Sequence, residues 1–171
     1  MELIPLSKEN ISLYIELATK SYYQHYLHLW KDADPIEYIR DNLSVEVVER
    51  DLENTNLEHF IITEEGEEAG IIKVVRNSAI MEYKADEALL IEKIYLLEEF
   101  SGKGIGKACL QYFKEYAISI GKKAIWLDTM KNGRPLPFYR AFGFEIVGEK
   151  QLSYPSVLEE QRPMVLLCLP L

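Results

Sequence analysis

Residues 89–107 read LLIEKIYLLEEFSGKGIGK, an apolar run followed by a loop with glycine at alternate positions. An amphipathic segment comes next, so the order predicts a strand, a glycine loop and a helix. Glycine lets the backbone turn tightly without a Cβ in the way. The loop N–H groups would lie beside a helix N-terminus, which favours negative charge. We therefore expect the stretch from Ser101 to Lys107 to bind a phosphate group.

Two common phosphate-binding motifs do not fit this loop. A Walker A motif needs Gly-x4-Gly-Lys-Ser/Thr, but alignment on Gly106 puts Ser101 at the first glycine and Ala108 at the hydroxyl position. A dinucleotide fingerprint needs Gly-x-Gly-x-x-Gly, and starting at Gly102 puts Lys107 at the third glycine. The sequence therefore argues against a nucleoside triphosphatase and a dinucleotide-binding enzyme.

The loop resembles the Gln/Arg-x-x-Gly-x-Gly/Ala pyrophosphate loop of the GCN5-related N-acetyltransferases, which bind acetyl-coenzyme A. Gly104 and Gly106 fill the two glycine positions, and Ser101 replaces the usual Gln or Arg. The resemblance implies that main-chain amides hold the pyrophosphate, so loss of that side chain need not abolish binding. The cofactor-binding residues that it implies in the loop are Ser101, Gly102, Lys103, Gly104, Ile105, Gly106 and Lys107.

The apolar periodicity predicts one domain over residues 1–171 and an α/β (α+β) fold. The expected elements are a strand at 3–6, helices at 11–26 and from 35 and 44, strands at 59–63, 70–75 and 89–97, a helix at 105–120, a strand at 124–127, a helix at 135–142, and strands at 144–147 and 164–169. Ser7 is the expected N-cap of the first helix. This order is similar to that of the same family. The resemblance implies a mixed, mostly antiparallel central sheet with a β-α-β crossover, helices on both faces, and a cofactor cleft where strands 89–97 and 124–129 splay apart.

The strand before the loop resembles the fourth strand of the family. There the resemblance implies that the backbone at Ile94 and Leu96 pairs with the pantetheine arm like an added strand. A backbone N–H at this place would also polarise the thioester carbonyl. We therefore count Ile94, Tyr95 and Leu96 among the cofactor-binding residues.

Residues 132–139 read NGRPLPFY and resemble the Asn-x-x-Ala-x-x-Phe-Tyr motif of the family. Asn132, Phe138 and Tyr139 match, and Pro135 replaces the alanine. The resemblance implies that the Tyr139 hydroxyl lies beside the cofactor sulfur and protonates the departing thiolate, and that Asn132 contacts the cofactor.

The family often uses a carboxylate as the general base on the strand that binds the cofactor, which is the expected strand 89–97 here. Strand alternation puts Glu92, Ile94 and Leu96 on one face and Lys93 and Tyr95 on the other. A carboxylate in a partly apolar cleft has a raised pKa, which suits a base. Glu92 is the expected base, with Asp128 or a water chain as alternatives, and a solvated or salt-bridged Glu92 as the plain structural interpretation.

The resemblance implies that the first helices and their connection build the acceptor pocket. That region contains residues 22–26 (YYQHY) and 28–30 (HLW), followed by Asp32, Asp34 and Glu37. Aromatic faces with nearby carboxylates suit an ammonium group, although the same residues also suit helix packing on a sheet. The segments 94–95 and 125–127 look similar to bacterial polyamine acetyltransferases of the family.

We therefore expect an acetyl-CoA-dependent N-acetyltransferase in which a small amine or polyamine attacks directly in a ternary complex. A protein amine as acceptor, and an acyl-CoA-binding sensor without turnover, are the alternatives. Direct attack needs no acyl-enzyme, and Cys109 is expected on a buried helix face.

The net charge of −9 argues against nonspecific nucleic-acid binding, which needs a basic surface. The two cysteines, Cys109 and Cys168, lie in apolar patterns without metal-type spacing, and His25 and His28 are not expected to bind metal. No stretch has membrane length and the N-terminus lacks a signal core, so we expect a cytoplasmic protein without a membrane partner. The sequence leaves open whether the chain forms a homodimer.

Overall fold

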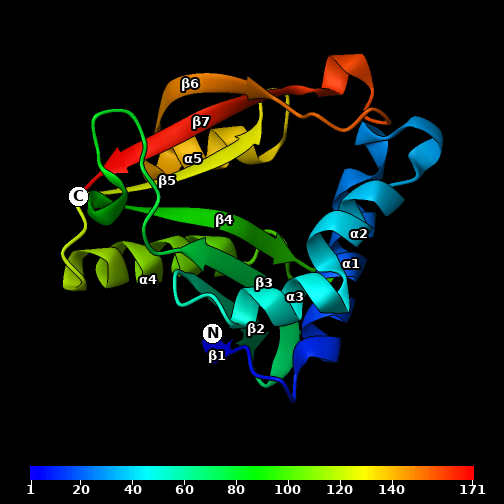
Figure 1. The fold of residues 1–171 in the computed structure, drawn as a ribbon, viewed down its shortest axis with the longest axis horizontal. Coiled ribbons are helices and arrows are strands. Elements are labelled where there is room, and N and C mark those ends of the chain that lie inside the picture. The colour runs from blue at the N-terminus through cyan, green and yellow to red at the C-terminus, as the bar shows by residue number, and fades with distance from the viewer.

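The computed structural model describes residues 1–171 and is built around one seven-stranded sheet (Figure 1). The strand order is β1-β2-β3-β4-β5-β7-β6. Neighbouring strands are antiparallel except for β4 and β5, which are parallel and joined through α4. The expected mixed, mostly antiparallel sheet with one β-α-β crossover is confirmed.

The elements follow the order that the periodicity predicts. The strands are β1 (Glu2–Pro5), β2 (Leu57–Glu64), β3 (Glu67–Val75), β4 (Ala88–Leu96), β5 (Ala124–Met130), β6 (Glu145–Gln151) and β7 (Pro163–Pro170). The helices are α1 (Ile11–Tyr26), α2 (Ile36–Leu43), α3 (Val45–Leu52), α4 (Ile105–Ser119) and α5 (Pro135–Phe142). Short 3₁₀ turns lie at Leu27–Leu29, Lys31–Ala33, Ala85–Glu87, Glu98–Phe100 and Glu159–Gln161.

Helices cover both faces of the sheet, with α1, α2 and α3 on one side and α4 and α5 on the other (Figure 1). Helix α4 buries Cys109, Leu110 and Phe113 against the strands, at the spacing of one helical face. Complete burial of a Leu or Phe side chain contributes about 1.5–3 kcal/mol. Helix α4 therefore holds the glycine loop at its N-terminus against a firmly packed core.

The start of the first helix differs from the expectation. Helix α1 begins at Ile11, after Asn10, so Ser7 is not its N-cap. The Asn10 side chain instead accepts a hydrogen bond from the Ser7 backbone N–H at 2.7 Å and closes a turn before the helix. Ser44 caps α3, because its hydroxyl accepts from the Val47 N–H at 3.4 Å.

Strands β4 and β5 pair over a short distance and then separate. Their register joins Ala88 with Ala124, Leu89 with Ile125 and Leu90 with Trp126, and ends there. Strand β4 continues to Leu96 without a neighbour on that side, so its edge is open from residue 91 onward. This opening is the splay that the family resemblance implies. None of the helices combines the length and the apolar character needed to cross a bilayer.

Candidate active site

The glycine loop connects the open end of β4 to α4. Gly102 has φ +76° and Gly104 has φ +88°, both in the left-handed region that glycine adopts without strain. A Cβ at either position would meet no atom within 4 Å. Glycine is therefore required there by the backbone path and not by crowding.

The N–H groups of this loop are free. Residues 102–107 donate no backbone hydrogen bond, and the first amide of the helix to do so is Ala108, to the Gly104 carbonyl at 3.0 Å. Consecutive unpaired N–H groups at the start of a helix form an anion-binding site. The loop thus has the donor set that a pyrophosphate needs.

Three separately predicted segments meet at Gly106. A Cβ on Gly106 would lie 3.5 Å from the Phe138 ring on α5 and 3.8 Å from the Leu96 side chain on β4. Close approach of these side chains explains why a glycine suits the position. The fold therefore brings the end of β4, the loop and the α5 motif together.

The open edge of β4 presents backbone groups toward β5. The Leu97 N–H donates to the Ala69 carbonyl at 2.9 Å, which directs the N–H groups of Tyr95 and Leu97 to β3. By alternation, the N–H groups of Ile94 and Leu96 face the opening. The His25 Nε2 atom lies 3.0 Å from the Leu96 carbonyl oxygen. That carbonyl is therefore engaged, while the two N–H groups remain available to a ligand.

A β-bulge changes the side on which Glu92 lies. Lys73 pairs with Lys93, but Val74 pairs with Ile91, so Glu92 has no partner on β3. Glu92 consequently projects to the same face as Lys93, toward the helices α1 to α3. The alternation expected from sequence, with Glu92 beside Ile94 and Leu96, is wrong because a bulge adds one residue to the strand.

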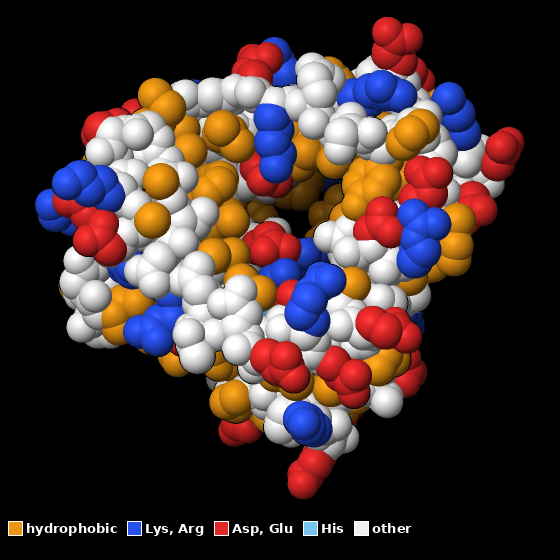
Figure 2. Space-filling view, in the orientation of Figure 1, with side chains coloured by type: hydrophobic (Ala, Val, Ile, Leu, Met, Phe, Trp, Pro, Cys, Tyr) orange, Lys and Arg blue, Asp and Glu red, His pale blue; other side chains and the backbone are white.

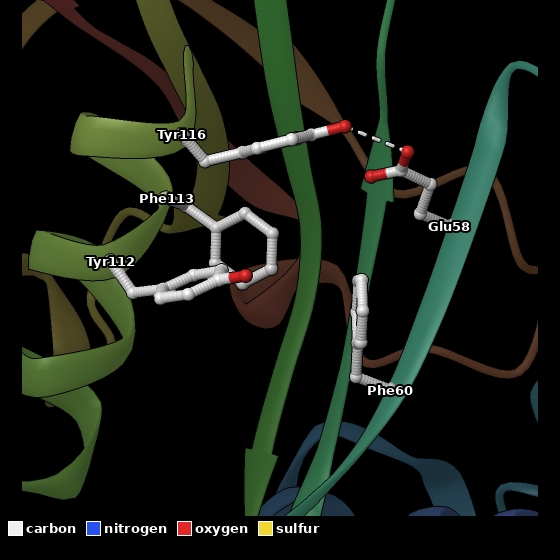
Figure 3. A pocket seen from close by; sticks show the side chains of 5 residues that line it. All are labelled: Glu58, Phe60, Tyr112, Phe113 and Tyr116. Atoms are coloured by element: carbon white, nitrogen blue, oxygen red, sulfur yellow. Dashed lines mark hydrogen bonds between the residues drawn. The ribbon is translucent and has the colours of Figure 1, made fainter. Parts of the chain in front are cut away.

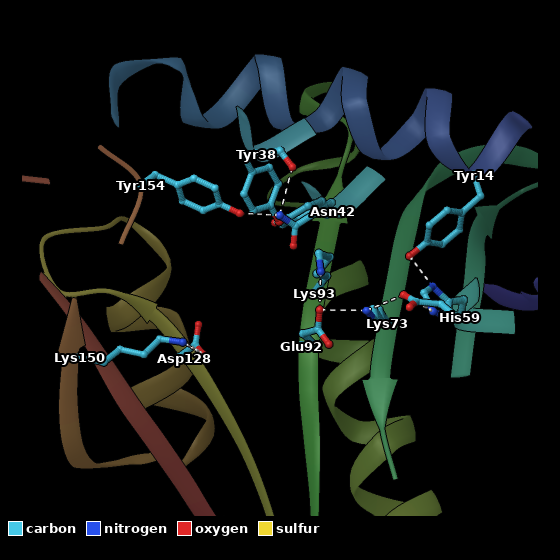
Figure 4. A network of polar contacts seen from close by, with 12 residues as sticks. Tyr14, Tyr38, Asn42, His59, Lys73, Glu92, Lys93, Asp128, Lys150 and Tyr154 are labelled. Atoms are coloured by element: carbon cyan, nitrogen blue, oxygen red, sulfur yellow. Dashed lines mark hydrogen bonds and ion pairs between the residues drawn. The ribbon is translucent and has the colours of Figure 1, made fainter. Parts of the chain in front are cut away.

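Two ammonium groups surround the Glu92 carboxylate (Figure 4). It contacts the Lys93 ammonium directly and the Lys73 ammonium at 3.1 Å. Burial alone would raise the pKa of Glu92, but the charges of Lys93 and Lys73 outweigh it and the pKa falls below its ordinary value. The raised pKa expected for a base is not found.

The polar contacts continue into the protein. Lys73 Nζ lies 2.8 Å from an Asp51 oxygen, and His59 Nε2 lies 3.5 Å from the same oxygen. The other His59 nitrogen, Nδ1, is 3.0 Å from the Tyr14 hydroxyl. Burial, with a further contribution from Lys73, lowers the pKa of His59 to about 4. The sequence gives no signal for this network, because its residues lie on separate elements and share no local pattern.

Tyr139 lies on α5, half-buried beside Phe138 and Phe144, with ring centroids 5.1 and 6.0 Å away. Burial raises the pKa of Tyr139 well above its ordinary value, and the nearby Tyr26 and Asp128 act in the same direction. Its phenol is therefore protonated at neutral pH. Asn132 is exposed in the turn between β5 and α5.

An aromatic cluster fills the space between α1, α2 and the sheet. Tyr22 stacks on Tyr38 with ring centroids 4.2 Å apart, and the Tyr38 hydroxyl bonds that of Tyr95. The remaining members are Tyr26, Trp30 and Tyr154. The expected aromatic acceptor region is thus also a packed cluster.

The carboxylates expected beside this cluster are not directed into it as a group. Asp32 and Asp34 are exposed, and the Asp34 side chain accepts from the Ile36 N–H at 3.0 Å. Glu37 accepts from the Ser156 hydroxyl. Neither contact directs a carboxylate toward the aromatic cluster, so the structure indicates no ligand for Asp32, Asp34 or Glu37.

Asp128 lies on β5, across the opening from Glu92, and pairs with Lys150 of β6 (Figure 4). Figure 2 shows that the same face of the molecule is hollowed, with hydrophobic side chains at depth and acidic and basic side chains around the rim. The hollow, the loop and the open strand edge form one candidate active site.

A separate hollow of about 150 Å³ lies between α4 and β2 (Figure 3). Its lining residues are Glu58, Phe60, Tyr112, Phe113 and Tyr116. The Tyr116 hydroxyl donates to Glu58 at 2.7 Å, so the carboxylate is already engaged. None of the predicted site residues contributes to this hollow.

Comparison with known proteins gives a consistent result. The sequence model described as the Acetyltransferase (GNAT) family matches residues 15–144. The chain is 19% identical over 144 residues to an uncharacterized N-acetyltransferase of Lactobacillus delbrueckii subsp. lactis, covering 84% of this chain and 83% of that protein.

Solved structures share the fold. The PaiA N-acetyltransferase from Thermoplasma acidophilum, in complex with coenzyme A, has a TM-score of 0.75 at 19% identity, covering 99% of this chain and 98% of that one. The spermidine/spermine N-acetyltransferase SpeG from Vibrio cholerae, with manganese ions, has a TM-score of 0.68 at 14% identity, covering 99% of this chain and 91% of that one.

Proposed function

The chain belongs to the Acetyltransferase (GNAT) family, and from this premise we propose that it is an acetyl-CoA-dependent N-acetyltransferase acting on a primary amine. One observation carries the proposal: six consecutive amides, residues 102–107, are unpaired at the end of an open strand edge, close to the α5 segment that bears Tyr139. This arrangement suits a ligand with a pyrophosphate at one end and a reactive acyl group at the other.

The cofactor would be held mainly by backbone groups. The amides from Gly102 to Lys107 suit the pyrophosphate, and the Lys103 and Lys107 side chains add positive charge. Ser101, which begins the loop, has its hydroxyl bonded to the Leu97 carbonyl at 3.3 Å and so supports the turn. The N–H groups of Ile94 and Leu96, on either side of Tyr95, suit the amides of the pantetheine arm.

The reaction is a direct transfer of the acetyl group. The neutral amine nitrogen bonds to the acetyl carbonyl carbon, the carbon–sulfur bond breaks, and the sulfur takes a proton from Tyr139. The nitrogen of the new amide releases its extra proton, and proton transfer through water restores the Tyr139 phenol. A strand N–H facing the opening would stabilise the charge that develops on the carbonyl oxygen. Asn132, in the turn before α5, is proposed to contact the cofactor.

Glu92 is the proposed proton acceptor on β4. It belongs to the network with Lys73 and Lys93 (Figure 4), and its side chain remains 30% exposed. Its lowered pKa keeps it ionised, so it can accept the proton that the acceptor ammonium loses. The same lowered pKa means that Glu92 holds this proton weakly and passes it on to water.

The proposed acceptor is a small amine or polyamine. The aromatic cluster reaches the open edge of β4 through Tyr95, which packs on Tyr22 and Tyr38, and aromatic faces attract ammonium groups. The net charge of −9 favours approach of a cation. Both features support this acceptor class over a neutral or acidic one.

Thermal shift and coenzyme A release test the proposal together. Acetyl-CoA should raise the unfolding temperature, whereas ATP should not. A thiol-detecting assay with polyamines, amino acids and peptides should then show release of coenzyme A with the polyamines and not with the peptides. Binding of acetyl-CoA without release for any acceptor would contradict the enzyme proposal and favour a binding role.

A further inference from the structure

The two walls of the opening each carry one carboxylate, and the two differ in their surroundings. Glu92 on β4 lies between Lys73 and Lys93, whose side chains are only 10% and 5% exposed. Asp51 lies behind Lys73, so two carboxylates face two ammonium groups. This set is balanced in charge, because each of its two carboxylates is paired with a lysine ammonium.

Asp128 on β5 has a single ionic partner, Lys150, and the side chain of that partner is exposed. The Lys150 ammonium sits at the Asp128 carboxylate, but the Lys150 side chain is 45% exposed and the Asp128 side chain 22%. Exposed ion pairs contribute little, because water competes for both charges and the long side chain loses freedom in the pair. Lys150 can therefore leave Asp128 at small cost.

Lys150 also shows what kind of group reaches Asp128. Its side chain ends in a primary alkylammonium, which is the group that a small amine carries at neutral pH. The ammonium of Lys150 therefore occupies the place at Asp128 that the ammonium of an amine ligand would take.

Asp128 is close to the groups that the proposed reaction uses. After burial and Tyr26, the charge of Asp128 is a further cause of the raised pKa of the Tyr139 phenol. Met130, two residues further along β5, packs with Tyr22 and Trp30 of the aromatic cluster. An ammonium on Asp128 would consequently lie near both the aromatic cluster and the proposed acid.

We propose that Asp128 binds an ammonium group of the acceptor, and that Lys150 is the internal cation which the acceptor displaces. A protonated nitrogen held on a carboxylate has no free electron pair and cannot attack the acetyl group. The attacking nitrogen is therefore a second amine of the same molecule, and the acceptor class is a diamine or longer polyamine. The reactive part of this inference rests on the proposed function.

Calorimetric binding of 1,4-diaminobutane to the protein loaded with coenzyme A tests this site without any acetyl transfer. Lys150→Met should tighten binding about two- to five-fold, because it removes the competing cation. Asp128→Asn should weaken binding at least about ten-fold, because it removes a charged acceptor. Asp128→Glu should retain much of the affinity. Butylamine should bind more weakly than the diamine.

The neighbouring pair Lys131 and Glu149 provides controls, because it links the end of β5 to β6 and the Lys131 side chain is as exposed as that of Lys150, both at 45%. Lys131→Met and Glu149→Gln change the net charge by the same amounts as Lys150→Met and Asp128→Asn. They should leave the affinity for 1,4-diaminobutane unchanged. In the Asp128→Asn background, Lys150→Met should have no further effect.

Two results would overturn the site: an affinity unchanged by Lys150→Met or Asp128→Asn, or the same change in the Lys131 and Glu149 controls. Binding that depends on Asp128, in a protein that acetylates no amine, would support the site and count against the acetyltransferase proposal. The two inferences therefore fail separately.

Discussion

The Lys73 ammonium lies 2.8 Å from an Asp51 carboxylate oxygen, in the interior between β3 and α3. Both side chains are almost fully enclosed. An ion removed from water loses several kcal/mol of hydration unless partners replace it. Each group of the set formed by Asp51, Lys73, Glu92 and Lys93 therefore depends on the others.

Replacing Asp51 by Asn should unbalance this buried set. Two ammonium groups would then share one carboxylate, and we expect a loss of about 3–5 kcal/mol in the free energy of unfolding. Urea denaturation measures this loss. Glu149→Gln, which breaks an exposed pair, should change the value by less than about 1 kcal/mol.

The double variant Asp51→Asn/Lys73→Met restores the charge balance and should recover part of the stability. An Asp51→Asn protein as stable as the original would show that water, and not the ion pairs, compensates these charges.

Tyr139→Phe should separate catalysis from binding. The substitution keeps the ring packed against Phe144 and removes only the hydroxyl. If the phenol protonates the leaving thiolate, turnover should fall by about 10²–10⁴-fold, while calorimetric affinity for acetyl-CoA stays the same. Tyr112→Phe, on the exposed side of α4, should leave both unchanged. Full turnover in Tyr139→Phe would remove this residue from the mechanism.

The glycine loop allows a matched comparison between two glycines with the same backbone conformation. Gly104 in the loop has φ +88° and Gly66 in the β2–β3 turn has φ +84°, and a Cβ at either place would meet no atom within 4 Å. Alanine at each should cost about 1 kcal/mol of stability, because the left-handed region disfavours a Cβ.

Cofactor affinity should distinguish the two variants. Gly104→Ala distorts the row of free amides and should weaken acetyl-CoA binding, whereas Gly66→Ala should not. Thermal unfolding and calorimetry on the same samples measure both quantities. Equal affinities for acetyl-CoA in the two variants would argue against the loop as the pyrophosphate site.

Local sequence patterns predict much of this structure. The glycine spacing predicts the left-handed turns at Gly102 and Gly104, and apolar periodicity predicts α4 and its end before Gly121, whose φ is +77°. Proline at the first positions of α5 and Gly143 after its end are equally local signals.

Features that depend on distant residues were not predictable from such patterns. The bulge at Glu92 arises from pairing with β3, and strict alternation places this residue on the wrong face. The pKa of Glu92 depends on Lys73, which lies on another strand. The separation of β4 from β5 was expected only from the family resemblance, because periodicity within a strand does not indicate which strands pair.

His59 makes stability depend on pH. Its pKa is lowered from 6.5 to about 4 by burial and by Lys73, so the unfolded chain binds a proton that the folded protein excludes. Stability should therefore be complete above pH 6.5, fall as pH decreases toward about 4, and change little further from this group below that. The shift corresponds to about 3 kcal/mol.

Urea denaturation between about pH 7 and pH 4 measures this contribution. His59→Gln keeps a polar partner for the Tyr14 hydroxyl and removes the titrating group, so its stability should be nearly flat over this range. Glu92 also contributes to stability, because its pKa is lowered in the folded protein. That contribution is complete above the ordinary carboxyl pKa of 4.5 and is lost only below it. An equally steep loss between pH 6.5 and 4.5 in His59→Gln would assign the effect to another group, because the buried imidazole is the group expected to titrate there.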